Sequence, residues 1–387
     1  MQKVNSQTCS FKKRIPNFEI MRVLAMWLIV IWHFFYHGVC NRQNGNDLLF
    51  YGNNICDIVN YIFSQAIFVF SSISVNLYVL ISGYFLIESN AKWHKIPMIW
   101  LQTAFYSLCF YLIFCIYGGI SFNAFDLIKS IAVIRFGSVE DRTYWFVAQY
   151  IGLLLLSPYL NMMASNLSKV NYRKLLVIVL LLDCSFGYLF YGEVYSGGQT
   201  LFHFVTIYLV AGYIRKFLLF KSVSVKKLIC LLVLIVLLLV AIDLGLSVIH
   251  SLRHHENLVF VLSSRYLNYN GVPVIMAVLF FCAMVNYKLR ENYIVRILVS
   301  LAPYSFGVYL IHDNFYVRRV LWQSVTQYMT FNHSNVIVLG LIVATSIFLF
   351  CTGVDFLRKK IFHLLRTELL IQKLTFFLKT FFFVLKK

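Results

Sequence analysis

Charged side chains are scarce in this sequence. Of its 387 residues only 13% are charged, whereas 60% are hydrophobic. Soluble globular domains carry about 25% charged residues, so this composition excludes a chain built of ordinary soluble domains. The sequence also has no internal repeat, no low-complexity linker and no polar block long enough to form a second domain.

Cysteine motifs for metal binding or redox chemistry are also missing. The nine cysteines include no Cys-x-x-Cys pair and no cysteine–histidine metal spacing, and most lie within apolar segments, where cysteine acts as a small hydrophobic residue. We therefore predict no metal site. Cys40 and Cys56 lie close together in the chain, and the sequence leaves open whether they form a disulfide or remain thiols.

Long apolar runs are what the sequence has instead. A bilayer core of about 30 Å needs roughly 20 apolar residues in a spanning helix, and lipid offers no partner to unpaired backbone amides. A barrel would show short alternating segments rather than such blocks. We predict an all-α integral membrane protein, a bundle of about ten transmembrane helices at 20–38, 61–87, 98–118, 144–162, 175–190, 201–215, 228–249, 270–287, 297–316 and 335–355.

Basic residues predict the orientation of these helices. With the N-terminus inside, the inner segments hold 26 of the 34 lysines and arginines. Short loops rich in Lys and Arg stay in the cytoplasm, so we predict that both termini are cytoplasmic. Membrane topology also accounts for the net charge of +19, and no nucleic-acid partner is expected.

Two kinds of segment lie outside the predicted helices. We divide the chain into a membrane domain at 1–355 and a basic tail at 356–387, in which apolar residues and cations favour a helix on the inner lipid surface. The outer segments 119–143 and 250–269 are either a lid or acceptor surface, or solvated loops. The first contains an amphipathic stretch at 123–136, and the second carries His254, His255, Glu256 and Arg265.

The first predicted helix carries a polar stripe. Its ionisable residues Glu19, Arg22, His33 and His37 fall on one helical face at about 100° per residue. Charged groups inside a membrane are costly, so we expect this face to point into the bundle. Arg22 lies near the cytoplasm and His33 about 16 Å further along the axis. This arrangement suits an enzyme whose donor substrate enters from the cytoplasm and whose acceptor enters from outside. The alternative is a structural role, in which His33 is a packing residue and Arg22 pairs with Glu19.

Four segments carry a resemblance to a known family. The run NFEIMRVLAMWLIVIWHFF resembles the opening of the type-three membrane acyltransferase family. SVNLYVLISGYFL, TYWFVAQYIGLLLLSPYLN and YSFGVYLIHDNF resemble its later segments, in the same order, so that the resemblance covers 17 to about 355. The resemblance implies transfer of an acyl group, commonly acetyl from acetyl-CoA, to a hydroxyl of a cell-envelope, capsular or exopolysaccharide glycan.

The resemblance and the chemistry together suggest roles. His33 and Arg22 match the family's histidine and arginine. The catalytic candidates are His33, Arg22 and Glu19, with His33 as general base and Arg22 fixing the donor or the fold around it. Arg22, Lys92 and Lys95 are candidates for the phosphates of CoA, although the family is often arginine-rich where this chain has only the two lysines. Oxyanion or substrate contacts are expected from Asn76, Tyr84, Trp145 and His312.

Partners and location follow from the same interpretation. We expect acyl-CoA as donor substrate rather than a bound cofactor, lipid and a glycan as the other partners, and a multi-pass location in a bacterial plasma membrane.

His312 and Asp313 are adjacent, therefore about 100° apart on a helix, and we expect that they do not both face one site.

Two other function classes are compatible with the sequence. A secondary transporter or glycan exporter would use Asp183 and Asp243, which lie within apolar runs, to relay protons. A membrane sensor or scaffold would carry out no chemistry, and alanine at Arg22 and His33 would then affect stability alone.

Overall fold

The computed structural model describes residues 14–41, 46–47, 50–51, 55–132, 144–186, 197–254, 259–260, 271–328 and 336–384. These residues are helical apart from turns and two short antiparallel pairings. β1 (Cys40–Asn41) pairs with β2 (Asn46–Asp47), and β3 (Phe50–Tyr51) pairs with β4 (Val259–Phe260). Cys56 is a free, exposed thiol, and the Cys40 side chain lies outside the described residues.

The described residues form the following helices. In chain order they are α1 (Pro16–His33), η1 (Phe34–Val39), α2 (Ile55–Ser71), α3 (Ser74–Leu86), α4 (Lys95–Ile116), α5 (Ala124–Ala132), α6 (Trp145–Asn166), α7 (Lys169–Leu181), η2 (Leu182–Phe186), α9 (Leu201–Phe217), α10 (Val225–His254), α11 (Val272–Asn286), α12 (Tyr293–Leu301), η3 (Ala302–Tyr304), α13 (Ser305–His312), α14 (Phe315–Tyr328), α15 (Val336–Leu364) and α16 (Thr367–Val384).

The all-helical membrane fold is confirmed, with fewer long spans than predicted. Within the described residues, seven helical stretches are long and apolar enough to cross a membrane: Pro16–Val39, Ile58–Leu86, Lys95–Ile116, Trp145–Asn166, Val225–Ile249, Tyr293–His312 and Val336–Leu364. The other three predicted spans coincide with α7, α9 and α11, which have 13, 17 and 15 residues. The span predicted at 270–287 is longer than α11, whereas α9 extends two residues past its predicted end at 215 and α7 continues into the π-helical segment η2.

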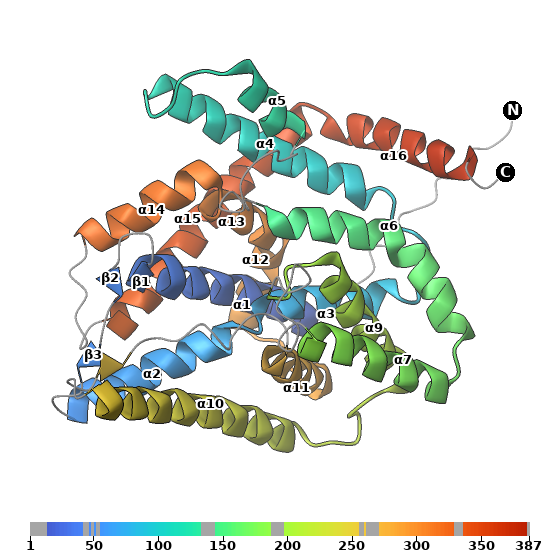
Figure 1. Ribbon diagram of the computed structural model, residues 1–387. Coiled ribbons are helices and arrows are strands. Elements are labelled where there is room, and N and C mark those ends of the chain that lie inside the picture. The colour runs from blue at the N-terminus through green and yellow to red at the C-terminus, as the bar shows by residue number, and fades with distance from the viewer. Residues whose placement is uncertain are drawn as a thin grey trace, which may run out of the picture.

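The core of the bundle forms around α1. This helix lies in the middle of the bundle and contacts α2, α3, α11, α12, α13 and α15 (Figure 1). The most extensive packing joins α3 to α9, where a Cβ on Gly83 would lie 2.8 Å from the Cβ of Ala211. Small residues let two helix backbones approach closely, which is the usual way helices associate in membranes.

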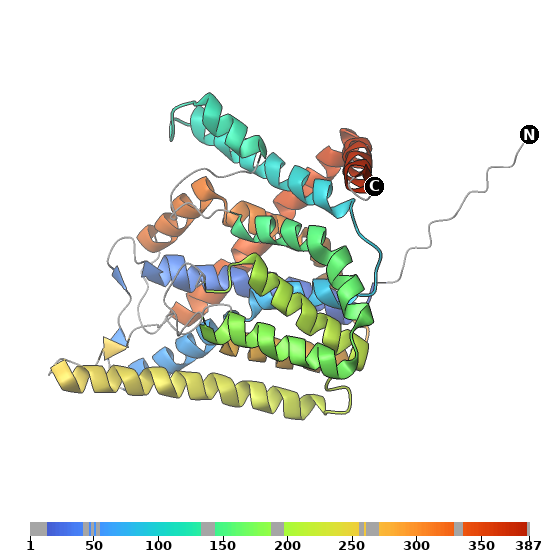
Figure 2. The same cartoon turned by 45° about the vertical axis from the view of Figure 1, so that its right-hand side comes forward.

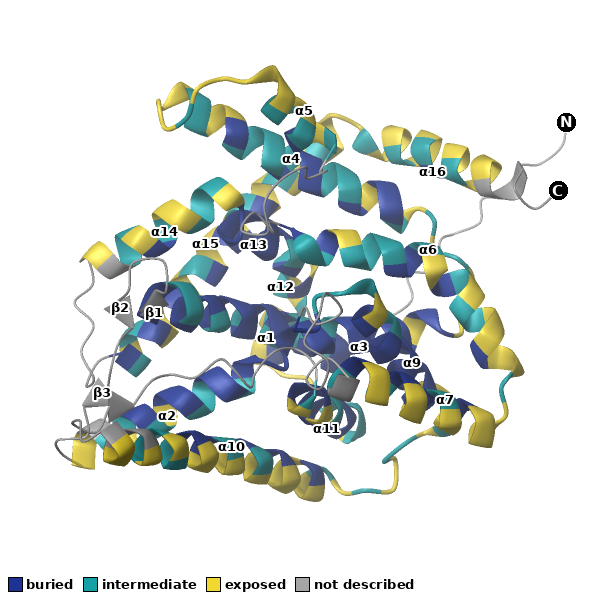
Figure 3. Cartoon of the chain, in the orientation of Figure 1, coloured by how far each residue is buried: buried dark blue, intermediate teal, exposed yellow. Residues whose placement is uncertain are grey.

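The outer helices expose apolar side chains. On α10, Leu231, Leu234 and Leu238 are exposed, and the outer face of this helix is yellow where α1, α3 and α9 are mostly dark blue (Figure 3). Such a surface suits contact with lipid. The β-strands lie at one end of the bundle and the α9–α10 turn at the other (Figure 2), the arrangement that the predicted outer and inner ends require.

The predicted tail and outer segments are partly described. α15 continues past 355 to Leu364, and α16 follows, packing on α4 and α15 (Figure 1). α16 is not among the candidate spans. α5 covers most of the stretch predicted to be amphipathic, and its remainder at 133–136 lies outside the described residues. His255, Glu256 and Arg265 also lie outside them, as does the His254 side chain.

Candidate active site

Glu19 and His33, near the two ends of α1, both point into the bundle. Glu19 is 7% exposed and His33 is 8% exposed. The Arg22 side chain is 33% exposed, and its guanidinium donates to the Glu19 carboxylate. The ion pair considered as an alternative is therefore present, and it holds Arg22 in the first half of α1 with part of its surface open.

His33 marks a change in helix geometry. α1 is α-helical as far as His33, and the chain then continues as the π-helical segment η1. π-helical turns inside α-helices are frequent at functional sites. The imidazole of His37 lies beside that of His33, with ring centroids 5.3 Å apart.

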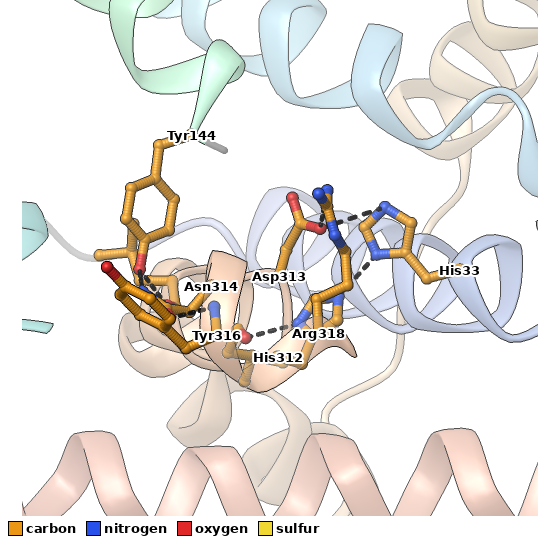
Figure 4. A network of polar contacts seen from close by, with 9 residues as sticks. His33, Tyr144, His312, Asp313, Asn314, Tyr316 and Arg318 are labelled. Atoms are coloured by element: carbon orange, nitrogen blue, oxygen red, sulfur yellow. Dashed lines mark hydrogen bonds and ion pairs between the residues drawn. The ribbon is translucent and has the colours of Figure 1, made fainter. Parts of the chain in front are cut away.

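His312 and Asp313 both approach His33, which corrects the expectation that they would not face one site. His33 Nδ1 lies 2.9 Å from His312 Nε2, and His33 Nε2 lies 4.0 Å from Asp313 Oδ1 (Figure 4). The expectation assumed a continuous helix, but α13 ends at His312 and Asp313 has φ −99° and ψ 11°. The backbone turns there, so the two side chains are not separated by the 100° expected for adjacent residues of a continuous helix.

The hydrogen bonds of the two histidines assign their protons. His312 Nδ1 lies 2.6 Å from the carbonyl oxygen of Val308, and a carbonyl can only accept, so His312 Nδ1 donates. With both rings neutral, His312 Nε2 then accepts from His33 Nδ1–H. The lone pair of His33 is left on Nε2, on the side of Asp313.

An arginine and a carboxylate complete this side of the site. Asp313 is 2% exposed, and Arg318 Nη1 donates to its Oδ1 at 3.3 Å. The distance of 4.0 Å from Asp313 to His33 is too long for a hydrogen bond but short enough for charge stabilisation of an imidazolium.

A tyrosine holds the turn that carries Asp313. Tyr144 OH donates to the carbonyl oxygen of Leu310 at 2.6 Å and accepts from Asn314 Nδ2 at 2.8 Å (Figure 4). Tyr144 adopts a left-handed φ of 57° just before α6. The sequence reasoning did not find Asn314 or Arg318, although the polar run after the apolar segment at 304–312 was a usable signal.

Tyr84 lies far from His33. It packs against Phe18 with ring centroids 5.2 Å apart, at the start of α1 and therefore about 20 Å along the axis from His33. Arg215 lies over its ring at 4.9 Å and donates to its hydroxyl at 3.3 Å. Tyr84 thus lies with Arg215 near the start of α1, away from the histidine pair.

The two lysines predicted to bind CoA lie near the start of α4. Lys92 is exposed in the turn before that helix, and Lys95 is half-buried at its first residue. Arg215, at the end of α9, is a further inner cation, and it also pairs with Glu88 at 2.8 Å.

Asn76 belongs to a second buried network. Its Oδ1 lies 2.8 Å from His203 Nε2, and His203 Nδ1 lies 2.6 Å from Asp183 Oδ2. Trp145 packs against Phe204, the neighbour of His203, with ring centroids 6.0 Å apart. This network ties α3 and η2 to α9.

The aspartates that motivated the transporter alternative both have local partners. Asp183 pairs with His203, and Asp243 accepts a hydrogen bond from the Gln65 amide. Both carboxylates are buried, at 8% and 6% exposure. Each is satisfied by a contact between neighbouring elements, which accounts for its presence in an apolar run.

Comparison with known proteins supplies the chemistry class. A family model described as an acyltransferase domain matches residues 15–378, a range that includes Arg22, His33 and His312. No curated protein and no solved structure matches the chain. Because the match covers most of a multi-pass helical membrane protein, the chain belongs to the acyltransferase 3 family of membrane acyltransferases.

Proposed function

We propose that this protein is an O-acyltransferase that moves an acetyl group from cytoplasmic acetyl-CoA to a hydroxyl of a cell-envelope glycan. The observation that carries the proposal is the oriented lone pair of His33 Nε2, fixed by the His312 hydrogen bond and faced by the Asp313 carboxylate. Acyl transfer is the chemistry of the family, and the choice of acetyl and of a glycan rests on the resemblance.

In the proposed reaction His33 is the general base. Its Nε2 takes the proton of the acceptor hydroxyl as that oxygen attacks the thioester carbonyl. The resulting imidazolium faces Asp313, whose negative charge stabilises it. When the tetrahedral intermediate collapses, the carbon–sulfur bond breaks and the imidazolium returns its proton to the thiolate of CoA. Asn76 and Trp145 stay candidates for the oxyanion; Tyr84 is better suited to the donor end.

The donor is proposed to enter from the inner end of α1. Arg22 lies eleven residues before His33, about 16 Å along the helix axis, a distance that the long pantetheine arm of CoA can cover. The anionic phosphates would then meet Arg22 and the nearby cations Lys92, Lys95 and Arg215. In this proposal both chain ends are cytoplasmic, the protein resides in a bacterial plasma membrane, and α16 lies on the inner lipid surface.

The test uses proteoliposomes loaded with radiolabelled acetyl-CoA and an external glycan acceptor. His33→Ala is expected to abolish label transfer, because removal of a general base typically costs about 10²- to 10⁴-fold in rate. His363→Ala, which removes an exposed histidine at the end of α15, is the matched control and should retain the wild-type rate.

Two outcomes would contradict the proposal. A His33→Ala protein that inserts normally and transfers label at the wild-type rate would remove His33 from the chemistry. Movement of unmodified glycan across the membrane in liposomes that lack acetyl-CoA would instead support the transporter class.

A further inference from the structure

We propose that His33, His37 and Asp313 form a binding site for Zn²⁺ at the end of α1, and that the bound ion inhibits acyl transfer by occupying His33 Nε2. Binding of the ion depends only on the three side chains, whereas the inhibition rests on the proposed function. No metal site was expected from the sequence, because Asp313 lies far from the two histidines along the chain and joins them only in the fold.

The ligand atoms are close enough to share one ion. One atom from each of His33, His37 and Asp313 lies within 4.8 Å of the others. Two imidazoles and one carboxylate form the protein ligand set of several zinc sites, in which the fourth position is open to water or substrate. His33 and Asp313 are buried and His37 is half-buried, so bulk water does not surround the cluster.

The hydrogen bonds behind His33 prepare it as a ligand. A metal-bound histidine usually donates its other ring N–H to a fixed partner, which sets the tautomer and the ring orientation. His33 Nδ1–H donates to His312 Nε2, and His312 in turn donates to the carbonyl oxygen of Val308. The Nε2 lone pair of His33 therefore points towards the cluster before any ion arrives.

Arg318 is expected to weaken the binding of Zn²⁺ at this site. Its guanidinium lies 3.3 Å from Asp313 Oδ1, so it competes for the carboxylate and repels a dication. Two neutral imidazoles and a carboxylate already paired with arginine should bind Zn²⁺ more weakly than the same ligands without the arginine. The site is therefore expected to tighten when Arg318 is replaced by a neutral residue, an effect opposite to that of removing a ligand.

The test is a Zn²⁺ titration of the purified full-length protein in detergent, in competition with a chromophoric chelator. We expect one Zn²⁺ per chain, binding weakened at least about tenfold in His37→Ala, and binding tightened in Arg318→Gln. His363→Ala is the matched control and should bind as the wild type does. Equal Zn²⁺ affinity in wild type and His37→Ala would overturn the site.

Two further measurements guard against a folding artefact and separate the two parts of the proposal. X-ray absorption at the zinc edge should show two imidazole nitrogens at about 2.0 Å in the wild type and one in His37→Ala. Zn²⁺ should inhibit acyl transfer by the wild type at concentrations that leave His37→Ala uninhibited. A zinc-loaded wild type that transfers at its full rate would overturn the inhibition while leaving the site intact.

Discussion

At the scale of single residues, the candidate site depends on which nitrogen of His33 carries the proton. The sequence places His33 on the polar stripe of the first helix and leaves a packing role as the alternative. The contact with His312, and the bond from His312 to a backbone carbonyl, turn that histidine into a base with a defined lone pair. His312 is thus a positioning residue for His33.

Substitution of His312 should slow the reaction without weakening donor binding. His312→Ala removes the acceptor for His33 Nδ1–H and frees the ring to rotate or change tautomer, so we expect kcat to fall by about 10²-fold with an unchanged KM for acetyl-CoA. His312→Gln offers an amide oxygen near the position of Nε2 and should retain more activity. Steady-state kinetics of both variants check this, and equal losses in the two would argue against a positioning role.

Asp313 should matter through its charge. Asp313→Asn keeps the shape of the side chain but removes the carboxylate 4.0 Å from His33 Nε2. The imidazolium formed during transfer then loses its counter-charge and faces Arg318, so we expect kcat to fall about tenfold to a hundredfold. The double variant Asp313→Asn/Arg318→Gln removes the unopposed cation and should recover part of the loss. If the single and double variants have the same rate, this electrostatic explanation is wrong.

At the scale of elements, close approach of helices places the two halves of the site. α13, which carries His312, lies against α15 at the point where Gly307 meets Asp355. Asp355 is fully buried and accepts bonds from Arg358 at 2.9 Å and from Tyr106 OH at 2.8 Å, so it also joins α4 to this pair. A buried carboxylate whose hydrogen bonds are satisfied in this way makes the packing of α13 against α15 rigid.

A methyl group at Gly307 should therefore destabilise the protein. A Cβ there would lie 2.1 Å from Asp355 Cγ, and overpacking of this kind costs typically about 1–3 kcal/mol. We expect Gly307→Ala to lower the thermal unfolding midpoint in detergent. Gly353→Ala is the matched control, because a Cβ at that position on α15 meets nothing within 4 Å. An unchanged midpoint for Gly307→Ala would show that α13 and α15 separate easily.

At the scale of the whole molecule, the proposed reaction requires that donor and acceptor reach opposite ends of α1. Arg22 and Arg215, which contacts Tyr84, lie towards the start of α1, whereas His33, His312 and Asp313 lie at its far end. A donor bound at one end and an acceptor at the other would meet along α1. This arrangement places the reaction within the bundle and requires that the two ends of α1 open to opposite sides of the membrane.

Thiol labelling checks that orientation. In intact cells, a membrane-impermeant maleimide should label the exposed thiol of Cys56, at the outer start of α2, in a variant that lacks the other cysteines. A cysteine introduced as Lys221→Cys, in the turn between α9 and α10, should react only after permeabilisation. The reverse pattern would place the N-terminus outside and reverse the assignment of donor and acceptor ends.

Much of the fold could be predicted because lipid leaves few choices. A long apolar run must be helical, since unpaired amides are costly in hydrocarbon, and basic loops indicate the inner side. Each predicted span therefore coincides with helical structure, and the burial of Glu19 and His33 followed from the cost of exposing them. Helix length was less predictable: the span predicted at 270–287 exceeds α11, whereas α9 runs on to Phe217, past the predicted end at 215.

An apolar helical bundle with a polar stripe on its first helix could be inferred from the amino-acid sequence, because these properties depend on composition and on one period of 3.6 residues. The convergence of His312 and Asp313 on His33, and the contact of Arg215 with Tyr84, could be seen only in the folded chain. The contacts of His33 join residues some 280 positions apart, and they depend on where α13 ends and how closely the helices pack, which no local pattern in the chain encodes.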